Sequence, residues 1–175
     1  MPDSGLLAPS LRENFLAGMS AAACTVNIVT TDGVAGRFGV TVSAMASVSA
    51  DGDRPTLLTC INERSASADG ILRNGVFCLN ILRADQSLIS DNFGGRVSPQ
   101  FADKFDCAEW MENPSGSPRI ADCLVAFDCR LISGEKIGTH YVFIGAVNHV
   151  FTSRTGQPLI YANRSYGVPL PFSQA

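Results

Sequence analysis

Short runs of β-branched and apolar residues, separated by turn sequences, recur along the chain. About seven such runs follow one another at hairpin-like spacing, and no helices stand between them as the regular crossovers of a parallel sheet. The run over residues 24–31, for example, alternates in polarity and is followed at once by the hairpin signal Asp32-Gly33. The pattern predicts a mainly β fold, either an antiparallel barrel or a sandwich.

Local signals place most of the individual elements. Ser10 and Glu13 have the spacing of a capping box, which predicts a helix that ends near residue 22. Its apolar residues Leu11, Phe15 and Met19 recur every four positions and are expected to pack on the sheet. The other predicted strands are 36–43, 56–61, 76–82, 124–132, 141–150 and 159–161, and the other predicted helices are 68–73, capped by Ser67, and 84–92. Residues 97–119 are expected to form an irregular excursion with one helical turn near 99–105.

The length of 175 residues fits a single domain, residues 1–175, with a loose arm at 1–9 and an extended tail at 167–175. The net charge is −3 and the basic residues are scattered, so no nucleic-acid partner is expected. No stretch has the length and apolarity of a membrane span and no secretory signal is visible, which predicts a cytoplasmic protein without a membrane partner. Only 17% of the residues are charged, and we expect part of this uncharged surface to be buried in a homodimer.

The six cysteines form neither a CxxC pair nor a zinc-ligand spacing. In a reducing compartment such cysteines are expected to behave as small buried apolar residues. The two histidines, His140 and His149, are not placed to make a metal site. If the protein carries out redox chemistry, the electrons are expected to pass through a cofactor and not through its own thiols.

Residues 36–49 are a candidate site for such a cofactor. They lack charge after Arg37 and carry hydroxyls among small residues, at Thr41, Ser43, Ser47 and Ser49. This combination leaves room and hydrogen-bonding groups for a flat ligand with polar edges. It also fits a sheet face whose hydroxyls point to water.

A second polar segment, residues 62–67, follows the next predicted strand. Its polar residues are Asn62, Arg64, Ser65 and Ser67. At the start of a helix such residues make a ready anion site, although they also fit an ordinary capped turn. A flavin would need both segments, together with an apolar floor that Val42, Ala44 and Phe93 could provide.

His140 opens an apolar strand in the sequence Gly138-Thr139-His140. A histidine at the mouth of a strand can donate to the carboxamide of a nicotinamide or to a flavin edge, and it can equally tie down a turn. His149, at the far end of the same run, is expected at the surface. No G-x-S-x-G elbow is present, so a serine hydrolase is not expected.

Six motifs occur in an order and spacing that resemble a known family. They are residues 25–33, 39–44 with 47–49, 55–62 with Ser65 and Ser67, 80–82, 93–95 and 138–140. Together they span about residues 11–166 and resemble the short-chain flavin reductases of the FMN-binding split-barrel type. The resemblance is strongest to the reductase component of 4-hydroxyphenylacetate 3-monooxygenases.

The resemblance implies a homodimeric, Greek-key antiparallel split β-barrel that binds FMN, or FAD in some relatives. It implies hydride transfer from NADH or NADPH to the flavin, and supply of reduced flavin or electrons to an acceptor such as a two-component aromatic monooxygenase. His140 would be the catalytic residue and would border the nicotinamide with Tyr166, while Phe93 and Gly95 would close over the cofactor. The other implied cofactor contacts are Thr41, Val42, Ser43, Ala44, Ser47 and Cys60, with Asn62, Ser65 and Ser67 at the phosphate.

Two alternatives stay open at this point. One is the flavin-dependent corrin reductase of the same family, which reduces cobalt(II) to cobalt(I) in cob(II)yrinic acid a,c-diamide during cobalamin synthesis. The other is a non-catalytic barrel that binds flavin or heme. The chain also departs from the family pattern, because Thr139 stands where many relatives have an aspartate in Gly-Asp-His.

Overall fold

The computed structural model describes residues 9–95 and 101–172. Its helices are α1 Leu11–Ala21, α2 Ala66–Asn74 and α3 Ser87–Phe93, with a 3-10 turn η1 at Lys104–Cys107. Its strands are β1 Cys24–Thr25, β2 Asn27–Thr31, β3 Phe38–Val42, β4 Met45–Ser49, β5 Thr56–Asn62, β6 Val76–Ile81, β7 Trp110–Glu112, β8 Pro118–Ile120, β9 Val125–Ile137, β10 His140–Thr152, β11 Ile160–Ala162 and β12 Ser165–Gly167. The prediction of a mainly β, antiparallel fold is confirmed.

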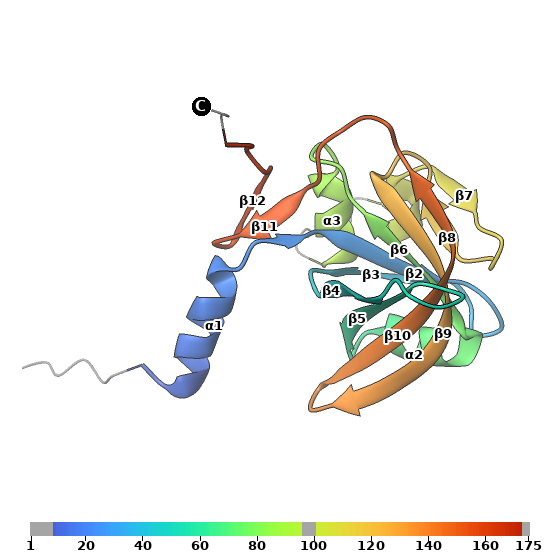
Figure 1. Ribbon diagram of the computed structural model, residues 1–175, viewed down its shortest axis with the longest axis horizontal. Coiled ribbons are helices and arrows are strands. Elements are labelled where there is room, and N and C mark those ends of the chain that lie inside the picture. The colour runs from blue at the N-terminus through green and yellow to red at the C-terminus, as the bar shows by residue number, and fades with distance from the viewer. Residues whose placement is uncertain (1–8, 96–100, 173–175) are drawn as a thin grey trace, which may run out of the picture.

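The main sheet has seven strands in the order β3-β2-β6-β9-β10-β5-β4, and all its pairings are antiparallel. β3 and β4 stand at opposite ends of this order, yet only Ser43 and Ala44 separate them along the chain. Because the Cα atoms of Val42 and Met45 can lie at most about 11 Å apart, the sheet must curl until its two edges meet. Figure 1 shows the resulting barrel, with β3 and β4 side by side. The bend at residues 43–44 therefore lies at the seam of the barrel.

Two apolar clusters hold the sheet on its two faces. The inner cluster centres on Phe77 and Phe143, which are fully buried inside the barrel. The outer cluster includes Ile28, Phe93 and Phe105 and joins the sheet to α3 and η1. Strand β2 is buried on both faces, because it contributes alternate residues to each cluster. The outer cluster and the bond from Thr41 to the Ser90 carbonyl hold α3 against the sheet, beside the seam.

Helix α1 begins as predicted but does not pack as predicted. Ser10 accepts the backbone N–H of Glu13, and the Glu13 carboxylate accepts the backbone N–H of Ser10. Leu11, Phe15 and Met19 are nevertheless 87%, 63% and 53% exposed, and no residue of α1 is buried. Figure 1 shows the reason, because α1 projects from the barrel beside the three-stranded side sheet β1-β11-β12. The predicted packing of this stripe on the chain's own sheet is wrong.

Other differences concern the ends of elements. The predicted helix 84–92 is the shorter α3, and the excursion at 97–119 contains η1 and the hairpin β7–β8. Residues 96–100, including part of the predicted turn at 99–105, lie outside the described residues, as do residues 1–8 of the predicted arm and 173–175 of the tail. Within the described ranges, no helix has both the length and the apolarity needed to cross a membrane.

Candidate functional site

The bend at the seam is held from both sides by threonine hydroxyls. Thr59 of β5 donates to the carbonyl of Ala44 at 2.9 Å, and Thr41 of β3 donates to the carbonyl of Ser90 in α3 at 2.7 Å. Ser43 and Ala44 themselves are exposed. A hydroxyl has one proton, so Thr41 can offer a ligand only an acceptor. The bend is thus a fixed polar edge that is open to solvent.

A cavity of about 150 Å³ lies beside this bend. Its walls are Val26, Thr41, Val42, Ser43, Ser90, Tyr161 and Tyr166. The rings of Tyr161 and Tyr166 meet edge to face, with centroids 5.4 Å apart and planes at 65°. The cavity therefore brings together four predicted cofactor contacts, Thr41, Val42, Ser43 and Tyr166, and gives them an aromatic wall.

A tight turn connects the end of β5 to α2. The backbone N–H of Ser65 donates to the carbonyl of Asn62 at 2.9 Å, and the N–H of Arg64 donates to Asn62 Oδ1 at 2.9 Å. The N-cap of α2 is Ser65, whose Oγ accepts the N–H of Ser67 at 3.3 Å. The prediction of Ser67 as the cap is wrong, because Ser65 is the last residue with extended backbone and Ser67 is already in the helix, 2% exposed.

This turn, which we call the anion corner, presents several hydrogen-bond donors. The donors are the hydroxyl of Ser65, Nδ2 of Asn62 and the guanidinium of Arg64. Across residues 9–95 and 101–172, none of these three groups donates to another protein group. A phosphate is held by donors of this kind at the start of a helix. The corner therefore fits the predicted phosphate contacts of Asn62 and Ser65.

His140 stands directly opposite Asn62 in the pairing of β10 with β5. The turn before it uses Gly138 at φ +59° and then Thr139, a two-residue loop that suits a hairpin. Thr139 Oγ1 lies 3.1 Å from His140 Nδ1, and the N–H of Glu63 donates to the carbonyl of Thr139 at 2.9 Å. Since Thr139 engages Nδ1, the Nε2 atom is the ring nitrogen left for a ligand. His140 thus lies beside the anion corner.

Not all the predicted residues meet at these two places. Phe93 is only 3% exposed, and its ring packs 5.1 Å from Phe105 in the outer cluster. A Cβ atom on Gly39 would lie 2.6 Å from the same ring, so Phe93 fills the space that this glycine leaves. Phe93 is a core residue and does not reach the surface of the chain, contrary to the prediction that it closes over a cofactor.

The other predicted contacts are distributed around the seam. Ser47 is exposed on β4, Gly95 is exposed at φ +64°, and Cys60 is half-buried on β5. Burial raises the pKa of the Cys60 thiol, which lowers the fraction present as the reactive thiolate. Tyr166 lines the seam cavity and His140 does not, so within one chain they border different parts of the site.

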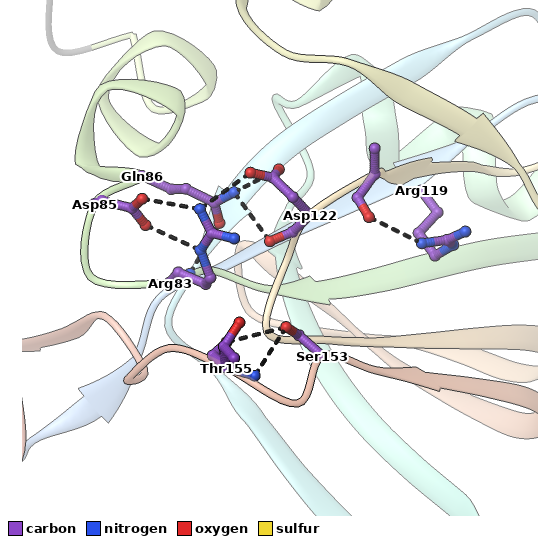
Figure 2. A network of polar contacts seen from close by, with 8 residues as sticks. Arg83, Asp85, Gln86, Arg119, Asp122, Ser153 and Thr155 are labelled. Carbon is purple, nitrogen blue, oxygen red and sulfur yellow. Dashed lines mark hydrogen bonds and ion pairs between the residues drawn. The ribbon is translucent and has the colours of Figure 1, made fainter.

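The two largest of the hollows described contain none of the predicted cofactor contacts. One, of about 580 Å³, lies around Arg54 and His149. The other, of about 570 Å³, lies around Arg119 and the network in Figure 2, where Arg83 is 2.8 Å from Asp85 and 3.1 Å from Asp122. Because both carboxylates already face Arg83, this network ties the loop before α3 to the β8–β9 turn. We assign the site to the smaller seam cavity, where the predicted residues converge.

The possible metal ligands and the thiols of the described chain lie outside the seam cavity. No group of three or more metal-ligating side chains is found in residues 9–95 and 101–172. All six cysteines are unpaired thiols, and burial raises the pKa of Cys123 to about 11 and that of Cys129 to about 12. Cys78, Cys123 and Cys129 are buried as predicted, whereas Cys24, Cys60 and Cys107 are only half-buried.

Comparison with known proteins gives one family. Residues 19–168 match the model of the flavin reductase like domain. FMN reductase (NADH) RutF 2 of Methylorubrum extorquens (strain PA1) is 43% identical over 158 residues, which are 90% of each chain. The structure of flavin reductase PheA2 superimposes with a TM-score of 0.82 at 26% identity, over 93% of this chain and 100% of that one. A homologue of nitrilotriacetate monooxygenase component B from Mycobacterium thermoresistibile gives a TM-score of 0.82 at 28% identity, over 94% of this chain and 89% of that one.

Proposed function

Because the chain belongs to the family of flavin reductase-like domains, we propose that it is an NADH-dependent FMN reductase. The observation that carries the proposal is that the matched region includes every residue predicted to contact the cofactor, from Thr41 to Tyr166. The closely similar relatives are named for FMN and NADH, so we take these as the cofactor and co-substrate in preference to FAD and NADPH.

The seam and the anion corner together fit FMN. Thr59, which holds the bend, lies three positions before Asn62 on β5, a separation of about 10 Å along the strand. A flat ring at the bend would thus have the phosphate donors of Asn62, Arg64 and Ser65 within reach of a short tail. Bound FMN would supply the acceptor for the hydride of NADH, which no protein side chain provides.

The chain's own residues would then bind the flavin and the nicotinamide and orient them toward each other. Thr59 and Thr41 keep the bend in one shape, so the exposed edge at residues 43–44 needs no rearrangement on binding. His140 offers Nε2 beside the corner, where it can hold the carboxamide of a nicotinamide. Tyr161 and Tyr166 form an apolar wall that excludes water from one side of the ring.

The function is tested by the oxidation of NADH, followed by its absorbance, in the presence of purified protein and FMN. We expect rapid oxidation that depends on added FMN and is slower with NADPH. Oxidation no faster than that of NADH with FMN alone would contradict the proposal.

The electron acceptor is proposed as the oxygenase component of a two-component system. One similar structure is a homologue of a monooxygenase component, and another is BorF, the flavin reductase component of a tryptophan halogenase. Supply to a cobalt corrin stays a prediction from the resemblance. Anaerobic mixing with a cobalt(II) corrin distinguishes the two, because only a corrin reductase would form cobalt(I) faster than free reduced flavin does.

We also propose that the protein is a homodimer. The apolar stripe of α1 is exposed in the single chain, and an isolated helix of 11 residues is only marginally stable in water. A second copy would cover this stripe. Light scattering at micromolar concentration should return about twice the chain mass of 18.5 kDa, and the monomer mass would contradict the proposal.

A cytoplasmic location is proposed from the thiols. The six unpaired cysteines are typical of a reducing compartment. Fractionation of producing cells checks this, and recovery of the protein outside the cytoplasm would contradict it.

A further inference from the structure

The hydroxyl of Tyr166 is held by two neighbouring residues of α3. It lies 2.6 Å from Asp91 Oδ1 and 2.9 Å from Ser90 Oγ. Asp91 precedes Tyr166 by 75 positions in the chain, so the contact joins α3 to β12 of the side sheet. Nothing in the local sequence around Asp91 indicates this contact.

Counting protons assigns a direction to these bonds. A phenol has a single proton, and a carboxylate can only accept, so Tyr166 gives its proton to Asp91. Ser90 then supplies its own hydroxyl proton to the phenol oxygen across the 2.9 Å contact. The bond to Asp91 is charge-assisted and is therefore the stronger of the two.

The same turn of α3 also holds the opposite wall of the seam cavity. The carbonyl of Ser90 accepts the hydroxyl of Thr41 at 2.7 Å, and Thr41 lies in β3 at the edge of the bend. Ser90 itself is 1% exposed and is fixed by the packing of α3. Residues 90 and 91 thus set the separation between Thr41 on one wall and Tyr166 on the other.

We propose that Asp91 is a positioning residue for the ring of the bound flavin. It holds the Tyr166 ring in place as one wall of the seam cavity, and it acts through Tyr166 without touching the ligand. The inference rests on the proposed function and extends it, because it concerns the ring end of the site and not the phosphate end. Loss of Asp91 should therefore weaken the binding of flavins with and without a phosphate equally, whereas loss of the anion corner should weaken only that of FMN.

The test is binding of FMN and of riboflavin to flavin-free protein, followed by quenching of flavin fluorescence. Asp91→Ala should raise the Kd of both flavins about tenfold, because both carry the ring. Tyr166→Phe should have the same effect, and the double variant should be no worse than either single variant, because each removes the same bond. Asp91→Asn retains an acceptor oxygen and should recover most of the affinity.

Asp85→Ala is the matched control. Asp85 lies just before α3 but pairs with Arg83 in the network of Figure 2, and it does not line the seam cavity. This variant should bind both flavins within about twofold of the wild type.

Three results would overturn the proposal. They are wild-type affinity of folded Asp91→Ala for both flavins, losses that add in the double variant, and a loss confined to FMN. If Asp91→Ala does not fold, the other two variants test the proposal. A wild-type Kd in Tyr166→Phe, or a full loss of affinity in Asp91→Asn, would contradict it. A wild-type protein that binds neither flavin would contradict the proposed function itself. A wild-type protein that binds both flavins, together with an unaffected Asp91→Ala, would contradict only the role of Asp91.

Discussion

Replacement of His140 by alanine is expected to lower kcat/KM for NADH about 10- to 100-fold while leaving the Kd for FMN within about twofold. The reason is that His140 presents Nε2 beside the anion corner, while Thr139 engages its other ring nitrogen. The side chain is exposed at the start of β10, so its loss should not disturb the fold. The measurement is steady-state NADH oxidation, with flavin binding measured separately by fluorescence.

His149→Ala is the matched control for this prediction. His149 is an exposed histidine near the opposite end of the same strand, and it lines a hollow outside the site. It should leave both quantities unchanged. An unaltered kcat/KM in His140→Ala, or an equal loss in both variants, would remove His140 from the site.

The largest expected effect on stability is that of Phe77→Ala, which should lower the free energy of unfolding by about 3–5 kcal/mol. Phe77 is 0% exposed inside the barrel. Its ring occupies the space beside Gly145, where an added Cβ would lie 2.5 Å from it. Because the strands around it are closed into a barrel, the cavity left by the ring is not expected to collapse.

Urea unfolding at a fixed protein concentration measures this difference, and the concentration must be fixed because association would contribute to stability. Phe172→Ala is the control, since Phe172 is 99% exposed and should change the free energy by less than about 0.5 kcal/mol. A loss below about 1 kcal/mol in Phe77→Ala would mean that the inner cluster does not hold the barrel together.

Features encoded by neighbouring residues were predictable from the sequence. The capping box at Ser10 and Glu13 is present, and Gly75 ends α2 at φ +71°, where only a residue without a Cβ is unstrained. The turn signalled by Asp32-Gly33 is also present, between the antiparallel strands β2 and β3. Each of these depends on contacts within a few residues, so local pattern is sufficient.

Features that depend on distant contacts were not predictable. The amphipathic stripe of α1 does not reveal that the side sheet holds the helix away from the barrel. Phe93 has the same sequence signal whether it covers a ligand or fills the space at Gly39. Ser90, Asp91 and Tyr161 belong to the site only because the fold brings α3 and the side sheet to the seam. No periodicity or motif in one chain encodes such a meeting.

The central claim is that the flavin ring lies at the barrel seam and its phosphate lies at the anion corner. Comparison of the Kd of FMN with that of riboflavin, which lacks the phosphate, tests it most directly. The account predicts that wild-type protein binds FMN at least about tenfold more tightly, and that Ser65→Ala with Arg64→Ala removes most of this difference without weakening riboflavin. Equal affinity for the two flavins, or a preference for FMN that survives the loss of both side chains, would contradict the account.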